Sequence, residues 1–506
     1  MNLNELTIKQ AHEGLVKKNF SSVELTQACL DQIKKTDKKI HSFILITKKE
    51  ALEQAKKVDK KIAQNEQIKV LEGIPAGIKD LLCAEGIKTT ACSKILENFI
   101  PPYDCTVIKK LKENGLIILG KQNCDEFAMG SSTENSAFGP TCNPWDLERV
   151  PGGTSGGPAA AVAANESIYS IGTDTGGSIR QPTAFCGIIG LKPTYGRVSR
   201  SGIIAYVSSF EQTGPITKTV EDAAIVLNAI AGNDKLDSTT SPKDVPDYTL
   251  NLNKDIKGIK IGLPREFFEQ KELDPKIKES IYEALKVFEK LGAKIEEMSL
   301  PMTKYAIAAY YIIAKAEASA NLARYDAIRY GEIKNQKLVL SEVEGSKIKN
   351  LSDYYLTARE SGFGDEVKRS IMMGTYTLSA GYYDAYYLKA TKIRTLIKQE
   401  YDKAFEKYDA LICPVSPILP FKIGEKVEDP LTMYLVDAFT APVNLAGLPS
   451  LTVPCGKIKM EKRAKEYIIG NGESLPTAFQ IIGKHFDEET ILRVGHNYEK
   501  AKKTQK

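Results

Sequence analysis

The spacing of hydrophobic residues along the chain switches several times between a helical period and a strand-like one. Apolar positions recur at helical spacing through residues 4–65, which predicts helices, and Ser21 with Glu24 forms a capping box that starts one of them. Short apolar runs punctuated by glycine or proline predict strands at 71–82, 116–119, 186–198, 410–413, 450–453 and 478–482. Helical patterns at 105–114, 219–231 and from 487 onward lie between or after these runs, so the sequence favours an α/β fold.

The second half of the chain adds a strand–helix–strand unit and a long helical region. Residues 259–262, 275–291 and 293–298 read as strand, helix and strand, which favours a parallel or mixed sheet. Residues 303–405 are mostly helical and rich in tyrosine, and most of these aromatic side chains read as helix-packing residues. We expect one domain over 1–506. It comprises a helical segment at 1–65, a core at 66–232, a polar surface connection at 233–257, and a remainder at 258–506 that includes the helical region.

Composition narrows the class of protein. Apolar residues make up 42% and charged residues 26% of the chain, and the net charge is only +5, which argues against a primary nucleic-acid binder. The nine cysteines are scattered without a metal-binding spacing, as expected for free thiols in a reducing compartment. The chain has no secretory signal pattern and no apolar run of about 18 residues, the length that a membrane-crossing helix needs. We therefore expect a cytoplasmic protein without a metal site.

Two glycine and hydroxyl clusters, at 152–157 and 173–178, flank an alanine-rich helix at 159–164. Glycine lets successive backbone N–H groups point into one concavity, and a hydroxyl beside such a nest is the arrangement of a nucleophile beside an oxyanion hole. Composition alone leaves a simpler alternative, in which both clusters are tight turns.

A serine nucleophile needs a base, and the sequence points away from histidine. His12, His41, His485 and His496 lie far from Ser178 in sequence and show no motif context, and the G-x-S-x-G elbow is absent. Lysine with a bridging hydroxyl is the other solution. Lys79 lies in an apolar strand, where desolvation would lower its pKa and make it a base. The alternative is a strand-end lysine paired with a carboxylate such as Asp80.

Residues 73–193 resemble the signature of the amidase signature family in order and spacing. The matching motifs are the two clusters, then Ile179 and Arg180, and then residues 190–193. The resemblance implies a central, twisted, mixed but largely parallel sheet covered by helices on both faces. It also implies that Lys79 is the base, Ser178 the acyl-forming nucleophile and Thr154 the bridge, held through a cis peptide. The N–H groups of Thr175, Gly176 and Gly177 would then form the oxyanion hole.

Further motifs at 127–140, 316–319, 374–376, 381–387 and 429–434 resemble one branch of the family, the glutaminase subunits of tRNA-dependent amidotransferases. In that branch the glutaminase chain hydrolyses glutamine and works in a heterotrimer. A B subunit uses ATP and Mg²⁺ to amidate glutamate carried by tRNA, and a small C subunit braces the pair. The resemblance implies no cofactor in this chain, contact with charged tRNA only through the B subunit, and substrate binding by Arg359, Asp429 and Tyr310. Whether aspartate carried by tRNA also serves as acceptor stays open.

This chain departs from the family pattern at two positions. Threonine 154 replaces the usual serine, so Ser155 is an alternative relay, and Pro158 stands where serine is common. Arg359, with Glu360 and Asp365 nearby, could also be an ordinary surface arginine. Two other functions stay open on the sequence: a stand-alone amidase acting on another small amide, and a non-catalytic scaffold subunit.

Overall fold

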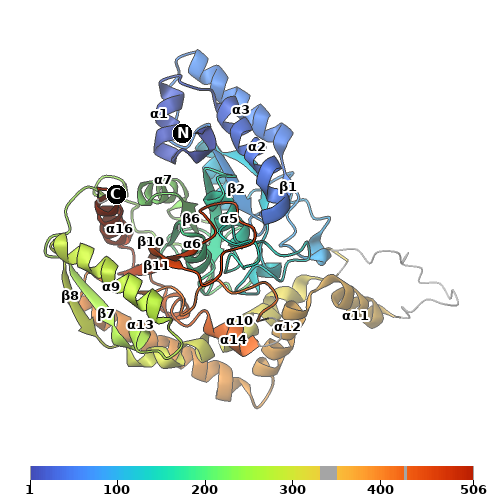
Figure 1. Cartoon of the computed structure of the whole chain (residues 1–506). Helices are drawn as coiled ribbons and strands as arrows, with labels where there is room; N and C mark the ends of the chain where they lie inside the picture. Colours follow the sequence, from blue (N-terminus) through green and yellow to red (C-terminus); the bar gives the residue numbers. More distant parts are fainter. Residues whose placement is uncertain (1, 327, 331–349, 427–429, 505–506) are drawn as a thin grey trace.

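A computed structural model of the chain describes residues 2–326, 328–330, 350–426 and 430–504. Within these residues one sheet of 11 strands runs through the molecule in the order β1-β3-β2-β4-β6-β5-β10-β11-β9-β7-β8 (Figure 1). The strands are β1 (Phe43–Ile46), β2 (Pro75–Lys79), β3 (Ile117–Gln122), β4 (Tyr169–Asp174), β5 (Ile189–Lys192), β6 (Gln212–Thr217), β7 (Lys260–Pro264), β8 (Lys294–Met298), β9 (Ala410–Pro414), β10 (Ser450–Lys459) and β11 (Ser474–Gly483).

The sheet is mixed, as expected, but the expectation of a largely parallel sheet is wrong. Parallel pairs are confined to its two ends, β3-β2-β4 and β9-β7-β8. The strands between β4 and β9 pair antiparallel throughout. The C-terminal strands β10 and β11 occupy the middle of the sheet, so chain segments far apart in sequence become neighbours there. No local strand–helix–strand pattern indicates this pairing.

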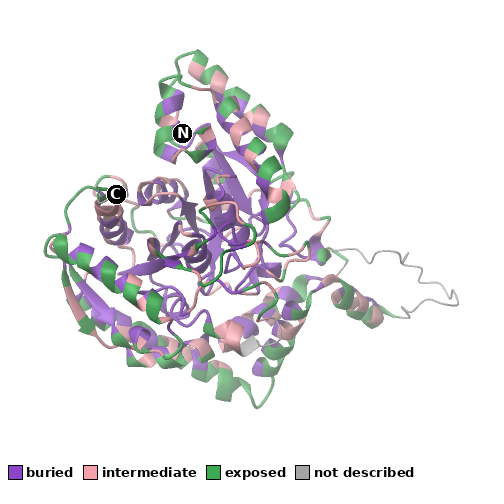
Figure 2. Ribbon diagram, viewed as in Figure 1, coloured by how far each residue is buried: buried purple, intermediate pink, exposed green. Residues whose placement is uncertain are grey.

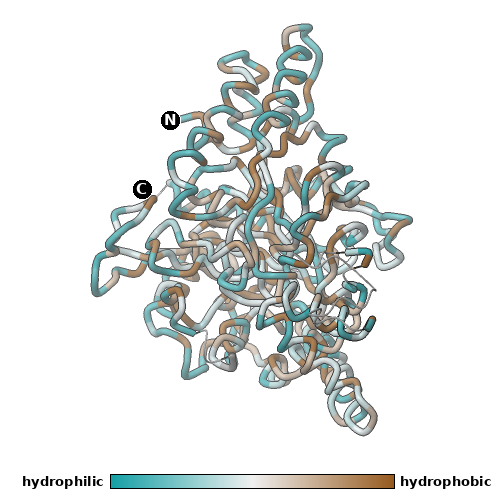
Figure 3. The backbone as a smooth tube through the Cα atoms, turned by 90° about the vertical axis from the view of Figure 1, so that its right-hand side faces the viewer, coloured by the Kyte–Doolittle hydropathy of each residue, from teal (hydrophilic) through white to brown (hydrophobic). Residues whose placement is uncertain are grey.

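The helices of the structure are α1 (Ile8–Val16), α2 (Ser22–Ile40), α3 (Lys48–Ala63), α4 (Thr106–Glu113), α5 (Gly156–Ala163), α6 (Arg180–Cys186), α7 (Val220–Ile230), α8 (Arg265–Phe268), α9 (Pro275–Lys290), α10 (Ala306–Asn321), α11 (Leu351–Gly362), α12 (Asp365–Leu378), α13 (Lys389–Lys407), α14 (Pro430–Leu435), α15 (Ala441–Ala446) and α16 (Glu488–Thr504). The Ser21–Glu24 capping box is present at the start of α2, and the Thr219 side chain caps α7. The N-terminal segment is not purely helical, because β1 lies between α2 and α3 and pairs with β3. Hydrophobic and hydrophilic residues alternate along the helices of this segment, which lie at the top of Figure 3.

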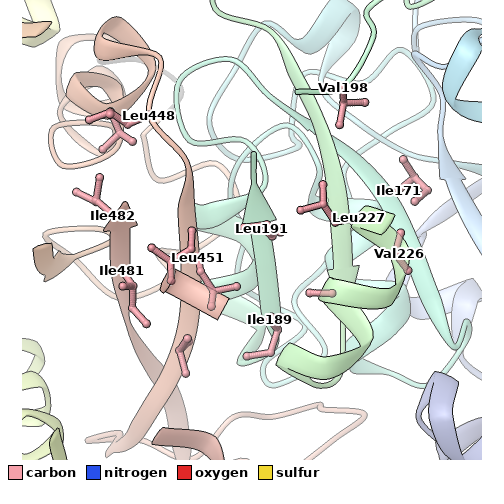
Figure 4. Packing of buried hydrophobic residues seen from close by; sticks show 14 of the residues in the cluster. Ile171, Ile189, Leu191, Val198, Val226, Leu227, Leu448, Leu451, Ile481 and Ile482 are labelled. Atoms are coloured by element: carbon pink, nitrogen blue, oxygen red, sulfur yellow. The ribbon is translucent and has the colours of Figure 1, made fainter. Parts of the chain in front are cut away.

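Helices cover both faces of the central strands. Ile189 and Leu191 of β5 point into a core that they share with Val226 and Leu227 of α7 (Figure 4). Gly190, which points to the opposite face, approaches Thr183 and Ile179 at α6. A separate small cluster on that side joins α5 and α6 to Ile216 of β6. The sheet and these inner helices are buried, whereas the outer helices expose their far sides (Figure 2).

Candidate active site

The turn between β4 and α6 is held rigidly by one carboxylate. Asp174, the last residue of β4, accepts hydrogen bonds from the N–H groups of Ile179 and Arg180 and forms a fully buried ion pair with the Arg180 guanidinium at 3.0 Å. Burial alone would raise the pKa of the Asp174 carboxyl, but the charge and hydrogen bonds of Arg180 lower it to about 2. Asn444 Nδ2 donates a further hydrogen bond to the same carboxylate at 2.9 Å. The turn that contains Ser178 is therefore fixed at both ends.

Between these anchors the backbone presents unused donors. Among the hydrogen bonds of the described residues, none is donated by the backbone N–H of Thr175, Gly176, Gly177 or Ser178. Gly177 has φ +145, and a Cβ there would lie 2.4 Å from Thr440 Oγ1. A Cβ at Gly176 would lie 2.4 Å from the Tyr310 hydroxyl, so glycine allows both close approaches. The turn thus forms a concave set of N–H groups suited to a negatively charged oxygen.

Lys79, at the end of β2, is fully buried among hydroxyl groups. Its Nζ lies 2.7 Å from Thr154 Oγ1, 2.9 Å from Ser155 Oγ and 2.9 Å from Thr173 Oγ1. Burial lowers the pKa of Lys79, and electrostatic coupling to Cys124, Glu211, Asp125 and Asp174 opposes this. Within the described residues Lys79 forms no ion pair, and the alternative partner Asp80 pairs instead with Lys121 at 3.1 Å.

The hydroxyls around Lys79 differ in what they can do with their protons. Ser155 Oγ donates to the Thr173 carbonyl at 2.9 Å and accepts from both Lys79 Nζ and the Thr173 N–H. A hydroxyl has one proton and two acceptor sites, so all three sites of Ser155 are occupied. Thr154 Oγ1 contacts only Lys79 among the described hydrogen bonds. The proton of Thr154 is therefore free to move, and that of Ser155 is committed elsewhere.

Ser178 lies beside this cluster and opens onto a cavity. Its carbonyl accepts a hydrogen bond from the Ser155 N–H at 3.1 Å, which joins the two glycine-rich turns. The residue is 8% exposed and lines a cavity of about 450 Å³. No hydrogen bond joins Ser178 Oγ to Thr154 Oγ1 in the described part of the chain, and every described peptide bond is trans. The cis peptide expected at Thr154 is therefore absent, and the residues before it, Gly152 and Gly153, have left-handed backbone with φ of +85 and +52.

The structure separates the residues expected to bind substrate. Tyr310 lines the cavity and stacks on Phe210, at a centroid distance of 5.6 Å. Arg359 does not line it: its guanidinium donates to the carbonyls of Leu322 and Tyr325, both at 3.2 Å, and lies over the Phe363 ring. Arg359 is thus not among the described residues that line this cavity, and its role in substrate binding stays a prediction. Asp429 lies outside the described residues.

Two charged side chains that no sequence motif singled out, Asp437 and Arg369, line the cavity. Asp437 accepts hydrogen bonds from Ser131 Oγ at 2.8 Å and the Tyr311 hydroxyl at 2.7 Å, and burial raises its pKa to about 7. Arg369 lines the cavity from α12 and pairs with Glu366, which also binds the buried Lys315 at 2.7 Å. Glu366 and Arg369 lie one helical turn apart, so the sequence could have indicated that they pair. Only the structure shows that they line the cavity.

Other kinds of site find no support in the described residues. No histidine lines the cavity, and no group of three or more histidine, cysteine, aspartate or glutamate side chains in the described chain could hold a metal ion. All nine cysteines are free. None of the described helices has the length and apolar character needed to cross a membrane.

Comparison with known proteins shows the family of the chain. A family model described as Amidase matches residues 24–492, and the chain belongs to this amidase family. The A subunit of glutamyl-tRNA(Gln) amidotransferase from Caldanaerobacter subterraneus subsp. tengcongensis is 54% identical over 503 residues, which cover 99% of this chain and 98% of the relative. The corresponding protein of Heliobacterium modesticaldum is 52% identical over 501 residues, with 99% and 98% covered. The crystal structure of the A subunit of glutamyl-tRNA(Gln) amidotransferase from Thermotoga maritima has a TM-score of 0.77 and 41% identity, covering 99% of this chain and 95% of that one.

Proposed function

We propose that this chain hydrolyses the side-chain amide of glutamine and supplies the ammonia to a tRNA-dependent amidotransferase, of which it is the glutaminase component. The observation that carries the proposal is the buried Lys79 amine surrounded by hydroxyls, next to Ser178 and a turn of unused N–H donors. The names of the relatives, which are similar over nearly their whole length, support the choice of glutamine over other amides.

In the proposed reaction Ser178 Oγ attacks the side-chain carbonyl carbon of glutamine. The Ser178 proton passes to Thr154, whose own proton passes to Lys79 Nζ, which is 2.7 Å from Thr154 Oγ1. The N–H groups of Thr175, Gly176 and Gly177 stabilise the negative oxygen of the tetrahedral intermediate. The proton returns through the same hydroxyl to the leaving nitrogen, ammonia departs, and a γ-glutamyl ester remains on Ser178. Water then hydrolyses the ester by the same proton path and releases glutamate.

The setting of Lys79 suits a base. A lysine can accept a proton only when neutral, and burial lowers its pKa toward the range where the neutral amine is populated. A neutral amine has two protons and one lone pair. Of the two candidate relay hydroxyls, Thr154 rather than Ser155 has a proton that can point at that lone pair, because the Ser155 proton is bound to the Thr173 carbonyl.

The cavity offers groups for both ends of an amino acid. We propose that Arg369 binds the α-carboxylate and Asp437 the α-ammonium of glutamine, in place of Arg359 and alongside or instead of Asp429. An arginine fork matches a carboxylate, and a buried carboxylate favours a cation. Tyr310, beside Gly176, would close the cavity over the reacting amide.

The proposal extends to the domain organisation, the partners and the compartment of the chain. The chain works as one domain, because one sheet extends from β1 to β8, and it binds B and C subunits in a heterotrimer in the cytoplasm. ATP, Mg²⁺ and charged tRNA act at the B subunit, and this chain needs no cofactor. The modest net charge of +5 suits a component that leaves tRNA binding to its partner.

The test is ammonia release from glutamine, measured for the chain alone, for the three-subunit complex, and for the complex with ATP and charged tRNA. We expect activity to rise along this series, with a γ-glutamyl adduct on the peptide that contains Ser178 after trapping with a glutamine analogue. Full activity in the lone chain would favour a stand-alone amidase. No ammonia in any mixture would favour a scaffold role.

A further inference from the structure

Glu211 precedes β6 and is placed against the candidate catalytic turn by strand pairing. In the β4–β6 ladder Thr173 pairs with Thr213 and Asp174 with Gln212, so Glu211 stands opposite the start of the turn. The residue is only 3% exposed. Thr175 Oγ1 donates a hydrogen bond to Glu211 Oε2 at 2.7 Å. The proposed proton path from Ser178 through Thr154 to Lys79 does not use this buried acid.

The other oxygen of Glu211, Oε1, is buried and has no hydrogen-bond partner among the described residues. A buried carboxylate oxygen without a partner costs free energy, about 1–3 kcal/mol for a polar group left unsatisfied. Such a group in a site calls for an explanation other than stability.

The charges around Lys79 supply that explanation. When Lys79 accepts the serine proton it becomes an ammonium ion in a buried place that contains no ion-pair partner among the described residues. The groups coupled to it electrostatically are the Cys124 thiol and Asp125 in the segment after β3, Asp174 of β4, and Glu211. One of these carboxylates can stabilise the ammonium form of Lys79 only if it has an oxygen that is free to interact with the new positive charge.

Two of the three carboxylates are already occupied. Both oxygens of Asp125 accept hydrogen bonds, from the N–H groups of Thr133 and Asn135. Both oxygens of Asp174 are held, chiefly by Arg180. In the described part of the chain, Glu211 alone among these three has an oxygen without a hydrogen-bond partner.

We infer that Glu211 is a positioning residue for amide hydrolysis: it holds Thr175 at the start of the N–H turn and provides the countercharge for Lys79 as Lys79 takes up the proton. This inference rests on the proposed function for the reaction, and it adds the residue that stabilises the charged base. Burial raises the pKa of Glu211 above its usual value, and the Lys79 charge and the Thr175 hydroxyl oppose this, so Lys79 and Glu211 favour each other's charged forms.

The test measures Ser178 reactivity without glutamine. The full chain is treated with phenylmethylsulfonyl fluoride over a range of pH, and the mass of the Ser178 peptide gives the rate. The serine oxygen bonds to sulfur, fluoride leaves, and the serine proton goes through Thr154 to Lys79. We expect the rate to rise with pH as Lys79 loses its proton.

Glu211→Gln keeps an acceptor for Thr175 and removes the charge. Without the countercharge the pKa of Lys79 falls, so we expect the rise in rate to move down by about one pH unit, the low end of the effect of a neighbouring opposite charge. The rate at the plateau should fall about tenfold, because a weaker base accepts the proton less well. Glu211→Asp, which keeps the charge, should retain the wild-type position of the rise.

Asp222→Asn is the matched control, since Asp222 is a buried carboxylate on α7 whose described contacts lie at α1 and Thr219. It should leave the profile unchanged. A Glu211→Gln profile that coincides with wild type to within roughly 0.3 pH unit, well below the effect of a nearby charge, would overturn the inference, as would a wild-type Ser178 that does not react at all. A shifted profile in a protein that releases no ammonia from glutamine would sustain the role of Glu211 and refute the proposed substrate.

Discussion

Replacing Thr154 by valine separates the relay from the packing around it. Valine has nearly the shape of threonine and lacks the hydroxyl that lies 2.7 Å from Lys79 Nζ. The loss of one buried hydrogen bond costs about 1 kcal/mol of stability. If that were the whole effect, and it fell entirely on the transition state, the rate would fall only about fivefold, since about 1.4 kcal/mol corresponds to tenfold.

A lost proton relay has a larger effect. Proton transfer by a positioned group contributes about 10²–10⁴-fold, or roughly 3–5 kcal/mol. We therefore expect Thr154→Val to lower ammonia release from glutamine by at least about 100-fold, with a fall of only a few degrees in melting temperature. Thr154→Ser, which restores the hydroxyl, should recover most of the activity.

Ser155→Ala should give the opposite pattern if the Ser155 proton is bound to the Thr173 carbonyl. It leaves the Thr173 carbonyl without its donor, so it should lower stability by about 1–3 kcal/mol and activity by less than about tenfold. The assay is steady-state ammonia release by the three-subunit complex, with thermal unfolding of each variant alongside. A Thr154→Val enzyme within about threefold of wild type, together with a Ser155→Ala enzyme that has lost its activity, would refute the reasoning and assign the relay to Ser155.

Four further outcomes can be checked. Lys79→Arg should lower ammonia release about 10²–10⁴-fold, because guanidinium does not lose its proton near neutral pH. Wild-type activity should fall as pH drops through the lowered pKa of Lys79. Equal activity in the variant would contradict the role of Lys79 as the base. Arg369→Met should raise the KM for glutamine at least about tenfold, whereas Arg359→Met should leave it nearly unchanged; the reverse order would restore Arg359 as the substrate residue. The pKa of Asp174 is lowered to about 2, so Asp174 contributes stability above its unfolded pKa of about 3.9, and this stability is lost as pH falls toward 2. Asp174→Asn should therefore unfold at a lower urea concentration at pH 7, and its free energy of unfolding should depend less on pH in the acid range. Gly177→Ala should lower the melting temperature by several degrees, as expected for about 1–3 kcal/mol of strain at φ +145, and an unchanged value would contradict the tight approach to Thr440.

Local signals in the sequence predicted many of the elements correctly. The β7–α9–β8 unit has a Pro275 start and an Asp274 cap that are legible in a short window. The strands β4 and β6 were not predicted, because β4 reads as part of a glycine-rich cluster and β6 carries glycine and proline in a fully buried strand. The antiparallel centre of the sheet depends on pairing between β5 and β10, whose residues are far apart along the chain.

The candidate site shows the same division. The motif brought Lys79, Thr154 and Ser178 to attention, and the structure places the first two in contact and the third beside them. The motif could not decide between Thr154 and Ser155, because that depends on which carbonyl accepts the serine proton. Nor could spacing tell Arg359 from Arg369, since both lie on helices and only the packing of α11 and α12 determines which one faces the cavity.

The central position of β10 and β11 has a consequence for how the chain is made. Until residues 450–483 have left the ribosome, β5 and β9 are bare edges of two separate half-sheets, and exposed strand edges are prone to aggregate. Pairing over such long separations is also slow, because the loop must close before any contact forms. We therefore expect a nascent chain to need protection from aggregation until nearly the whole of it has been synthesised, and a premature stop before β10 to leave the two half-sheets unjoined.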